Sequence, residues 1–584
     1  MRFKSRRTDG YVIYAISGVN TISFAIDFEK ANIKGLLGFA IERHDLIDNE
    51  SYFVNGFKVF KERIPHPDEN TVVSTFDNPV QSFVWDDFTG KPGYRYRYNF
   101  YPLKGSPRNI DRLSKPIEIL VETEQLFSTT NEHDVFFNRG VASSQAFSRR
   151  FGNKIPDTKV DPAREGEVFD WLARDLKKGM ISFIQQAKKG DTILGCFYEF
   201  RYKAVVTAFK QAIQNGVNVK IIIDAKENKE NFPRNDNLAT IKDVGISSSH
   251  IILRKARKSA IQHNKFMVFL TGKSQQPKAV WTGSTNISEG GIFGQTNVGH
   301  WIRNEKIAKQ YKSYWDLLST DPGSTGDESR AVTIKKNDAY KQSVIALQKD
   351  VTSEDIKKIS HALLPFFSPR TSETMLHTYA QLLDSAKEYG GITLAFGISD
   401  VFRNILADNT TKDQIIFMLL EKKDMPKKGE KDFTYLGVKN NVYEASGSYI
   451  QDPLYQWTKE INTKILSLNN HVLYIHSKFL LVDPMSDKPI VVTGSANFSS
   501  ASTVENDENM VLIKGNKRVA DIYFTEFNRL FNHYYFRSIY EQLKKGQDNK
   551  DSSLFLEPND SWLSKYEKGK LRYKRVMIFR KMAI

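Results

Sequence analysis

Residues 475–497 read IHSKFLLVDPMSDKPIVVTGSAN, and this stretch decides how the whole chain is interpreted. Its apolar run FLLV predicts a buried strand. Because residues i and i+2 of a strand share a face, the His and Lys of this stretch point the same way, as do its later Ser and Asn. The polar residues that carry the pattern are His476, Lys478, Asp483, Ser495 and Asn497.

An earlier part of the chain repeats this pattern. QHNKFMVFL contains His263 and Lys265, and VWTGSTNIS contains Ser284 and Asn286. The distance from His to Asn is 23 residues in this copy and 21 residues in the later one. Of the 11 His in the chain, only these two are followed by Lys two residues later. Two copies of one grouping imply two half-sites that come together.

The doubled pattern resembles the signature of the phospholipase D superfamily, which is His-x-Lys-x4-Asp followed by Gly-Ser-x-Asn and is used twice. The resemblance covers about residues 166–540. The later copy is complete, and it is followed by Glu508, where family members often carry a carboxylate that orients an active-site His. The earlier copy departs from the pattern, because Leu270 replaces the Asp and Asn297 replaces the later Glu.

These residue types suit the cleavage of a phosphodiester. One neutral imidazole attacks phosphorus to form a phosphohistidine, and a second imidazole donates a proton to the leaving oxygen. Lys and Asn side chains offset charge on the non-bridging oxygens, so the reaction requires no metal or other cofactor. The resemblance implies that His263 is the nucleophile and His476 the acid. Spacing does not decide this: Glu508 supports His263 if it reaches across the repeats, and the roles reverse if it contacts the His of its own repeat.

Composition narrows the choice of partner. The formal net charge of +16 favours a polyanion, either nucleic acid or an anionic membrane surface, although an excess of Lys can also reflect the composition of the source. A single Cys, Cys196, excludes an internal disulfide and a zinc site built on Cys pairs. No secretory signal and no run long enough for a membrane helix is recognisable, so we expect a cytoplasmic protein. A basic cluster precedes the first His-x-Lys as a candidate substrate-binding site: Arg254, Lys255, Arg257 and Lys258.

A length of 584 residues predicts a multidomain protein. Short runs rich in Val, Ile, Phe and Tyr over residues 1–128 predict an all-β sandwich of immunoglobulin or fibronectin type, a candidate module for binding a protein partner. Helix and strand patterns then alternate, which predicts two α/β repeats related by a pseudo-two-fold axis. The expected divisions are 1–128 for the sandwich, 129–165 for a connector, 166–330 and 331–540 for the repeats, and 541–584 for a basic tail. Within the second repeat, residues 424–470 are expected to form a long insertion, which either shapes substrate access or is a surface excursion.

Three functions follow from these observations. The first is an intracellular, metal-independent nuclease that cleaves DNA or RNA. The second is a phospholipase D or phosphatidyltransferase that acts on membrane lipids. The third is a catalytically weak protein that binds phosphate as a sensor. The sequence leaves the oligomeric state open.

Overall fold

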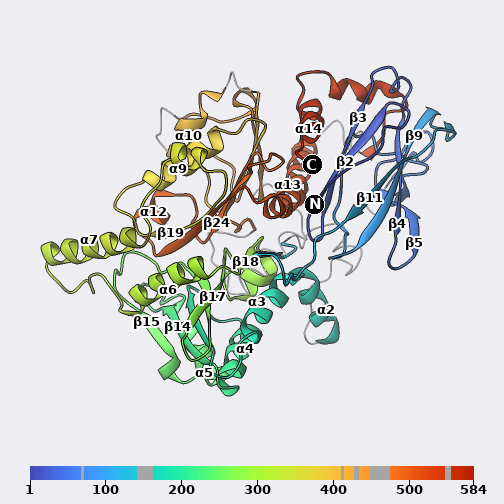
Figure 1. Ribbon diagram of the computed structural model, residues 1–584. Helices are drawn as coiled ribbons and strands as arrows, with labels where there is room; N and C mark the ends of the chain where they lie inside the picture. Colours follow the sequence, from blue (N-terminus) through green and yellow to red (C-terminus); the bar gives the residue numbers. More distant parts are fainter. Residues whose placement is uncertain (68–70, 141–161, 410–412, 427–432, 448–473, 546–553) are drawn as a thin grey trace. The chain divides into compact units, whose positions relative to one another are not determined.

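The computed structural model describes residues 1–67, 71–140, 162–409, 413–426, 433–447, 474–545 and 554–584. Part of the predicted insertion, residues 448–473, lies outside the described residues. The chain divides into two compact units, which are described separately (Figure 1). Unit 1 comprises Met1–Leu126, Asp483–Pro489 and Lys517–Ile584, and unit 2 comprises Phe127–Val482 and Ile490–Asn516.

Unit 1 contains two antiparallel sheets, as the alternating runs of the N-terminal region predict. One sheet has the order β1-β2-β3-β8 and the other has the order β10-β9-β4-β5, with β11 paired to β9. The first sheet consists of β1 (Arg2–Lys4), β2 (Tyr11–Ser17), β3 (Ile22–Phe28) and β8 (Val84–Asp87). The second consists of β4 (Gly38–Asp45), β5 (Glu50–Phe53), β9 (Arg95–Ser106), β10 (Asn109–Asp111) and β11 (Ile117–Glu122). A two-stranded ribbon adds β6 (Asn55–Gly56) and β7 (Val73–Ser74).

One apolar core joins both sheets of unit 1. Ile13 and Phe24 of the first sheet belong to the same buried cluster as Tyr98 and Ile119 of the second. The alternation of buried and exposed residues along β11, in the pattern BeBeBe, explains why period-two runs were recognisable in the sequence.

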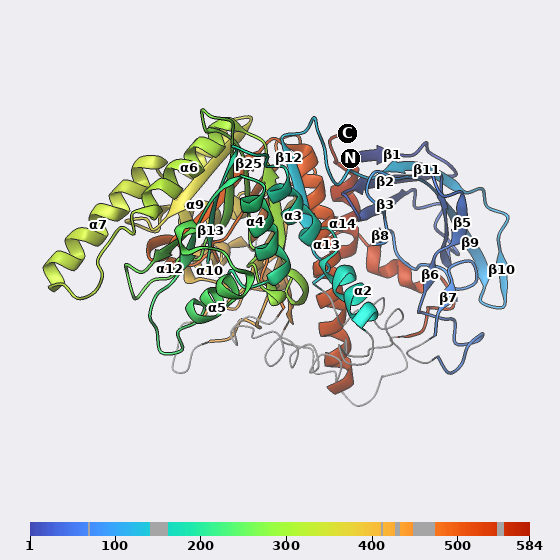
Figure 2. The same cartoon turned by 90° about the horizontal axis from the view of Figure 1, so that it is seen from below.

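The C-terminal segment is part of this core, so the prediction of a separate basic tail over 541–584 is wrong. Trp562 is 1% exposed and belongs to the unit 1 cluster together with Tyr566 and Val576. The helices of this region are α13 (Lys517–Lys545), η8 (Asp560–Tyr566) and α14 (Leu571–Arg580). Helix α14 packs against β3 and β8 (Figure 2). The sequence pattern did not indicate this, because its basic residues mask a short apolar face.

Unit 2 contains two seven-stranded sheets with the same topology. The first has the order β12-β18-β17-β16-β13-β14-β15 and the second has the order β19-β25-β24-β23-β20-β21-β22. In each, the last two pairings are parallel and the others are antiparallel. This correspondence is the structural form of the repeat seen in the sequence.

The strands of the first sheet are β12 (His133–Phe137), β13 (Thr192–Phe197), β14 (Asn218–Asp224), β15 (Ile251–Arg254), β16 (Lys265–Thr271), β17 (Gln276–Gly283) and β18 (Val298–Ile302). Those of the second are β19 (Ala362–Ser368), β20 (Tyr389–Leu394), β21 (Ile415–Leu420), β22 (Val442–Ser446), β23 (Phe479–Val482), β24 (Ile490–Gly494) and β25 (Glu508–Lys514). β13, β20 and β21 are buried along their whole length, as is typical of strands covered on both faces.

Helices cover these sheets (Figure 1). In the first repeat they are α2 (Pro162–Ala173), α3 (Leu176–Gln185), α4 (Lys203–Gln214), α5 (Arg234–Val244) and α6 (Glu305–Ser319), with the short turns η1 (Ser248–His250) and η2 (Gly290–Gly294). Helix α7 (Arg330–Leu347) leads to the second repeat, which adds α8 (Ser353–Lys358), α9 (Thr374–Asp384), α10 (Asp400–Leu406), α12 (Ser500–Val504) and the turn η4 (Val438–Asn440).

The divisions of the chain differ from those expected. Strand β12 lies within the predicted connector 129–165, yet it pairs with β18 and forms the edge of the first repeat. Helix α13 begins inside the predicted second repeat but belongs to unit 1. Both differences have one cause: sheet pairing and helix packing join segments that are far apart in sequence, and local composition carries no signal of that.

Candidate functional site

The two His-x-Lys segments occupy the same place in their sheets. Lys265 opens β16 and pairs with Phe197 at the end of β13, and β23 follows Lys478 in the same arrangement. Strand topology therefore brings both segments to the edge where parallel strands end, which is the usual ligand-binding edge of such sheets. The His263 and His476 rings lie side by side, with centroids 6.4 Å apart and planes at 75°.

Matching backbone bonds join the two half-sites. Asp507 donates its N–H to the Ile261 carbonyl at 3.0 Å, and its own carbonyl accepts the His263 N–H at 2.9 Å. In the other half-site, Thr296 donates its N–H to the Tyr474 carbonyl at 2.7 Å. Each His-x-Lys segment is thus held by a segment of the other repeat.

Glu508 contacts the His of the other repeat. Both carboxylate oxygens lie 3.0 Å from Nδ1 of His263, and the carboxylate is fully buried. Of the two arrangements that the sequence left open, this is the one that reaches across the repeats. A carboxylate at Nδ1 holds the imidazole so that Nε2 faces away from it, toward the other half-site.

Asn297 makes the corresponding contact with the second His. Its Oδ1 lies 2.9 Å from Nδ1 of His476. Its Nδ2 donates to the Gly291 carbonyl at 2.9 Å, which fixes the direction of the amide. The His476 Nδ1–H therefore donates to an uncharged oxygen. The two half-sites share a geometry but differ by one charge.

The two Lys side chains are buried beside the His pair. Each ammonium donates to the carbonyl of the His that precedes it by two residues, at 2.5 Å for both Lys265 and Lys478. Burial lowers the pKa of Lys265 to about 7, against the opposing effect of Glu508. Burial, reinforced by the charge of Lys265, also holds the pKa of Lys478 well below its ordinary value. Burial disfavours the charged form of both Lys side chains, and an anion bound beside them restores that charge, so the site favours an anion.

The ionisation of the His residues follows from the same environment. Burial and the two neighbouring Lys charges hold the pKa of His263 well below 6.5, and the pKa of His476 is lowered in the same way. Burial raises the pKa of Glu508 to about 8, although Lys265 and Lys478 oppose the rise. Because Glu508 and His263 share a hydrogen bond, they titrate as a pair.

The Gly-Ser-x-Asn motifs hold the strands that carry these partners. Ser284 Oγ accepts the Val298 N–H at 3.1 Å, and Ser495 Oγ accepts the Asn509 N–H at 3.0 Å. Ser284 also donates to Asn297 Oδ1 at 2.8 Å. Both Ser residues therefore orient the segment that holds a His.

Glycine is required before each Ser because two strands approach closely there. A Cβ on Gly283 would lie 2.2 Å from the Val298 carbonyl oxygen, and one on Gly494 would lie 2.2 Å from the Asn509 carbonyl oxygen. Such contacts with backbone force the strands apart. The motif is thus Gly-Ser because of packing as well as chemistry.

Of the two motif Asn residues, Asn286 is buried and Asn497 is half-buried, and each has an unused acceptor atom. Among the described residues, neither Asn286 Oδ1 nor Asn497 Oδ1 has a hydrogen-bond partner. Asn286 Nδ2 donates to Glu199 Oε1 at 2.8 Å, and Arg201 Nε donates to the other oxygen of that carboxylate at 3.0 Å. Glu199 was not recognised from the sequence. Its one signal was an acidic residue directly after the buried run ILGCFY.

Asp483 is not brought together with the other motif residues. It follows the last residue of β23, whereas Lys478 precedes the first, so the whole strand separates them. Asp483 has φ of 44° and opens the segment Asp483–Pro489, which belongs to unit 1. The expectation of Asp483 as a site residue is therefore corrected. Five residues of extended strand span about 16 Å, which is too far for contact with the His pair.

The predicted basic cluster is divided between interior and surface. Arg254 is fully buried and pairs with Asp507 at 2.9 Å, and Arg257 is 4% exposed and lies 3.5 Å from the same carboxylate. These two guanidinium groups are not available to a substrate, which corrects the prediction. Lys255 and Lys258 remain exposed.

Asp507 is a second residue that sequence analysis missed. Besides Arg254, its carboxylate accepts the Tyr340 hydroxyl of α7 at 2.8 Å. Since Asp507 directly precedes Glu508, this buried network fixes the start of β25 beside His263. The sequence shows two adjacent acidic residues before an apolar run. It does not show that one contacts Arg254 and the other contacts His263.

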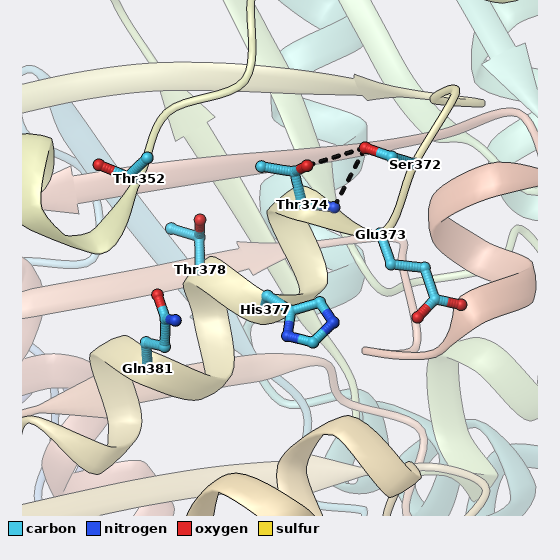
Figure 3. Close-up of a pocket in the computed structure, with 7 residues that line it drawn as sticks. All are labelled: Thr352, Ser372, Glu373, Thr374, His377, Thr378 and Gln381. Carbon is cyan, nitrogen blue, oxygen red and sulfur yellow. Dashed lines mark hydrogen bonds between the residues drawn. The ribbon is translucent and has the colours of Figure 1, made fainter.

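A surface pocket of about 410 Å³ lies apart from these residues, at the start of α9 (Figure 3). Hydroxyl groups dominate its lining, and Ser372 and Thr374 hydrogen-bond to each other at 2.8 Å. His377 also lines it and is exposed. None of the His-x-Lys or Gly-Ser-x-Asn residues contributes to it, so it is not the candidate active site.

Neither a metal-binding cluster nor a membrane-spanning helix is present in the part of the chain that the structure describes. Its residues contain no group of three or more His, Cys, Asp and Glu side chains arranged as a metal site would need. None of its helices combines the length and the apolar run that crossing a lipid bilayer requires.

Fold and site together define a two-repeat protein in which each repeat supplies one His and one Lys to a shared, phosphodiesterase-like centre. The family described as "Cardiolipin synthase, PLD-like domain" matches residues 180–318 and 379–531, together half of the chain. The chain therefore belongs to the phospholipase D superfamily. Among curated proteins, no sequence matches it.

Several solved structures are similar to this chain. Phosphatidylserine synthase of Haemophilus influenzae is 14% identical over 70% of this chain and 94% of its own, with a TM-score of 0.42. Nuc of Salmonella typhimurium is 25% identical over 25% of this chain and 87% of its own, with a TM-score of 0.21. Yeast tyrosyl-DNA phosphodiesterase is 11% identical over 56% of this chain and 83% of its own, with a TM-score of 0.28.

Proposed function

We propose that the protein is a phosphodiesterase that works through a phosphohistidine on His263, and that its substrate is a nucleic acid. The contact of Glu508 with His263 across the repeats is the observation that carries the assignment of the nucleophile. It gives one of the two His residues, and not the other, an acidic partner that stabilises the cation formed on attack.

In the first step, ionised Glu508 accepts the Nδ1–H of His263 and leaves its Nε2 lone pair free to attack phosphorus. The P–N bond forms as the P–O bond to the leaving group breaks. His476 donates the proton of Nε2 to the leaving oxygen. The negative charge of a bound phosphodiester raises the pKa of His476, so that this proton is present. Ring centroids 6.4 Å apart leave room for a phosphoryl group between them.

In the second step, His476 takes a proton from water, whose oxygen attacks phosphorus. The P–N bond breaks and its electron pair returns to His263. Lys265 and Lys478 balance the charge on the non-bridging oxygens in both steps, with Asn286 and Asn497 as further polar contacts. No step requires a metal.

The excess of positive charge favours a nucleic acid. The chain has 84 Lys and Arg against 68 Asp and Glu. A polyanion that presents many phosphates gains more from this excess than a substrate with one phosphate does. A second candidate is a phospholipase or phosphatidyltransferase activity, which the words "cardiolipin synthase" in the description of the matching family favour.

The direct test offers plasmid, single-stranded DNA, RNA and phosphatidyl vesicles to the purified protein in EDTA. Wild type is compared with His263→Ala and His476→Ala, and with His377→Ala as a control that removes an exposed His of α9. We expect nucleic-acid cleavage that both site variants lose and the control retains. Release of lipid head groups instead moves the protein to the second candidate. Substrate binding without turnover by the wild type supports the sensor function.

Trapping the intermediate tests the assignment of roles. His476→Ala lacks the acid of the first step, so the substrate is a p-nitrophenyl phosphodiester, whose leaving group needs no proton. The variant then forms the phosphoryl adduct on His263 but does not activate water, so the adduct accumulates. Acid quenching destroys a phosphohistidine and alkali preserves it, so peptide mapping is done at high pH. An adduct on His476 in the His263→Ala protein reverses the roles.

We also infer that the repeats are related by a pseudo-two-fold axis and that the sheets of unit 1 form an immunoglobulin-like sandwich. Identical strand orders and reciprocal contacts at Asp507 and Thr296 support the first inference. The single core shared by two antiparallel sheets supports the second.

A further inference from the structure

The C-terminal segment of unit 1 lies beside residues 57–61. Val59 donates its N–H to the Leu554 carbonyl at 3.0 Å, and Leu556 donates to the Val59 carbonyl at 2.8 Å. Trp562 then ties the segment to the core, where its indole N–H donates to the Leu36 carbonyl at 2.9 Å. The side chains of this region are therefore presented on a fixed scaffold.

Three cationic side chains are grouped on this scaffold. Lys58 precedes Val59, which pairs with Leu554 and Leu556. Lys565 precedes Tyr566, and the Arg572 guanidinium lies 5.9 Å from the centre of the Tyr566 ring.

Within the described residues, none of these three cations forms an ion pair with a carboxylate within 4.0 Å. Lys58 is half-buried, and Lys565 and Arg572 are exposed. Burial first, and then the charges of Lys565 and Arg572, lower the pKa of Lys58, while Glu557 opposes them. Holding like charges together in this way costs free energy that a bound anion recovers.

Several other cationic side chains of the molecule have carboxylate partners. Arg254 and Arg257 share Asp507, and each has a further carboxylate partner, Asp321 for Arg254 and Glu505 for Arg257. Lys570, next to this group, pairs with Glu567 at 2.8 Å. Lys58, Lys565 and Arg572 are distinguished by being grouped together, since isolated surface lysines such as Lys273 are exposed singly. Lys61 adds a fourth charge nearby, 5.5 Å from the centre of the Phe555 ring.

The surface around these cations is polar, which distinguishes between two kinds of polyanion. A membrane-binding basic helix exposes an apolar face that enters the lipid. In α14 the apolar side chains Val576, Ile578 and Phe579 are buried in unit 1. Within the described residues 554–584, the one exposed large hydrophobic side chain is that of Ile584, which lies outside α14. A charged surface without apolar anchors suits the backbone of a nucleic acid.

We propose that Lys58, Lys565 and Arg572 form a phosphate-backbone binding site for nucleic acid on unit 1. The site shares no residue with the His pair, and it acts without sequence preference because its contacts are to phosphates. It goes beyond the proposed catalytic function and gives unit 1 a role in holding substrate.

The test measures binding in the absence of cleavage. In a His263→Ala background, Lys58→Gln/Lys565→Gln/Arg572→Gln is compared with the parent by fluorescence anisotropy of a labelled single-stranded DNA over a series of salt concentrations. The matched control, Lys188→Gln/Lys189→Gln/Lys273→Gln, removes three exposed charges from unit 2. We expect the site variant to lose at least about tenfold in affinity, and its log–log salt slope to fall by about 2, as three phosphate contacts predict.

Unchanged affinity and slope in the site variant overturn the proposal, as does an equal loss in the control. Loss of binding to phosphatidylglycerol vesicles with unchanged DNA binding assigns the site to membranes and also overturns it. Should the triple variant fail to fold, Lys565→Gln and Arg572→Gln carry the test, since both side chains are exposed. The experiment measures binding and not cleavage, so its result does not depend on whether the protein is a nuclease.

Discussion

Glu508 and Asn297 hold equivalent places in the two repeats, and in the proposed mechanism a single charge separates the roles of the two His residues. Glu508 lies 3.0 Å from His263, and Asn297 lies 2.9 Å from His476. A carboxylate stabilises an imidazolium better than an amide does. The asymmetry of the chemistry thus rests on one pair of positions.

Replacing Glu508 tests this directly. We expect Glu508→Gln to lower kcat by about 100-fold or more, because Gln keeps the shape but cannot offset the charge on the attacking imidazole. The measurement is kcat on whichever substrate the cleavage test in EDTA identifies. Glu505→Gln is the control, since Glu505 is half-exposed and pairs with Arg257 at 3.1 Å, so it should stay close to wild type. An unchanged kcat in Glu508→Gln contradicts the assignment of His263.

The pH dependence follows from two opposite shifts. The pKa of Glu508 is raised to about 8, so its carboxylate ionises only as the pH rises toward 8. Ionised Glu508 accepts the Nδ1–H of His263 and leaves Nε2 available to attack. The pKa of Lys265, lowered to about 7, means that its positive charge is already being lost as the pH rises through about 7, before Glu508 is fully ionised. We therefore expect a narrow bell in kcat/KM with its maximum between pH 7 and 8.

Lys265→Arg separates the two limbs of this profile. Arginine remains protonated at every accessible pH, so the fall on the alkaline side should disappear while the rise on the acid side remains. The profile is measured as kcat/KM against pH, which reports the ionisation of groups in the free enzyme. An alkaline fall that persists in Lys265→Arg assigns that limb to a different group.

At the scale of elements, one buried carboxylate joins three segments. Asp507 at the start of β25 binds Arg254 at the end of β15 and Tyr340 of α7. Helix α7 connects the repeats, so the same contact fixes the connection and the segment that carries Glu508. The equivalent residue on the other side, Thr296, is uncharged, and its hydroxyl lies 3.2 Å from that of Ser477.

Substitutions in the Asp507 network should lower the free energy of unfolding by very different amounts. Asp507→Asn removes the buried carboxylate that lies against both Arg254 and Arg257, and Asp321 then remains as the partner of Arg254. The substitution should lower the free energy of unfolding by about 3 kcal/mol. Tyr340→Phe removes one hydrogen bond and should cost about 1 kcal/mol. Chemical denaturation gives both values. Lys341→Gln, which breaks the pair with Glu505 at the surface, is the control, and a similar loss in all three variants contradicts the argument.

At the scale of the whole molecule, unit 1 is completed by distant parts of the chain. Its N-terminal sheets share their core with Trp562, Tyr566 and Val576 from the C-terminal segment. Such a unit cannot be separated from the rest by one cut in the chain. This explains why divisions drawn from composition alone differ from the compact units.

Replacing Trp562 tests whether the C-terminal segment belongs to the core of unit 1. Trp562→Ala should destabilise unit 1 by about 3–5 kcal/mol, because it leaves a cavity in a closely packed core. Thermal unfolding followed by near-ultraviolet circular dichroism and limited proteolysis report the loss. Ser561→Ala, at the exposed neighbouring position, should leave both unchanged. A stable Trp562→Ala protein with intact unit 1 contradicts the inclusion of the C-terminal segment in its core.

The sequence by itself determined the residues of the two half-sites and the class of fold. His263, Lys265, His476 and Lys478 were recognisable because strand periodicity places each pair on one face, and buried apolar runs identified the strands that follow them. The strand-rich N-terminal region was predicted for the same reason. These signals are local, and local patterns report which side of an element is buried.

Only the tertiary structure decided which partner each of these residues meets. His263 and Glu508 are 245 residues apart in sequence, as are Asn264 and Asn509, and no periodicity relates them. The same holds for Arg254, which looked like a surface charge until its contact with Asp507 placed it in the interior. Burial of a charge is determined by the carboxylate that neutralises it, and that carboxylate arrives from another repeat when the chain folds.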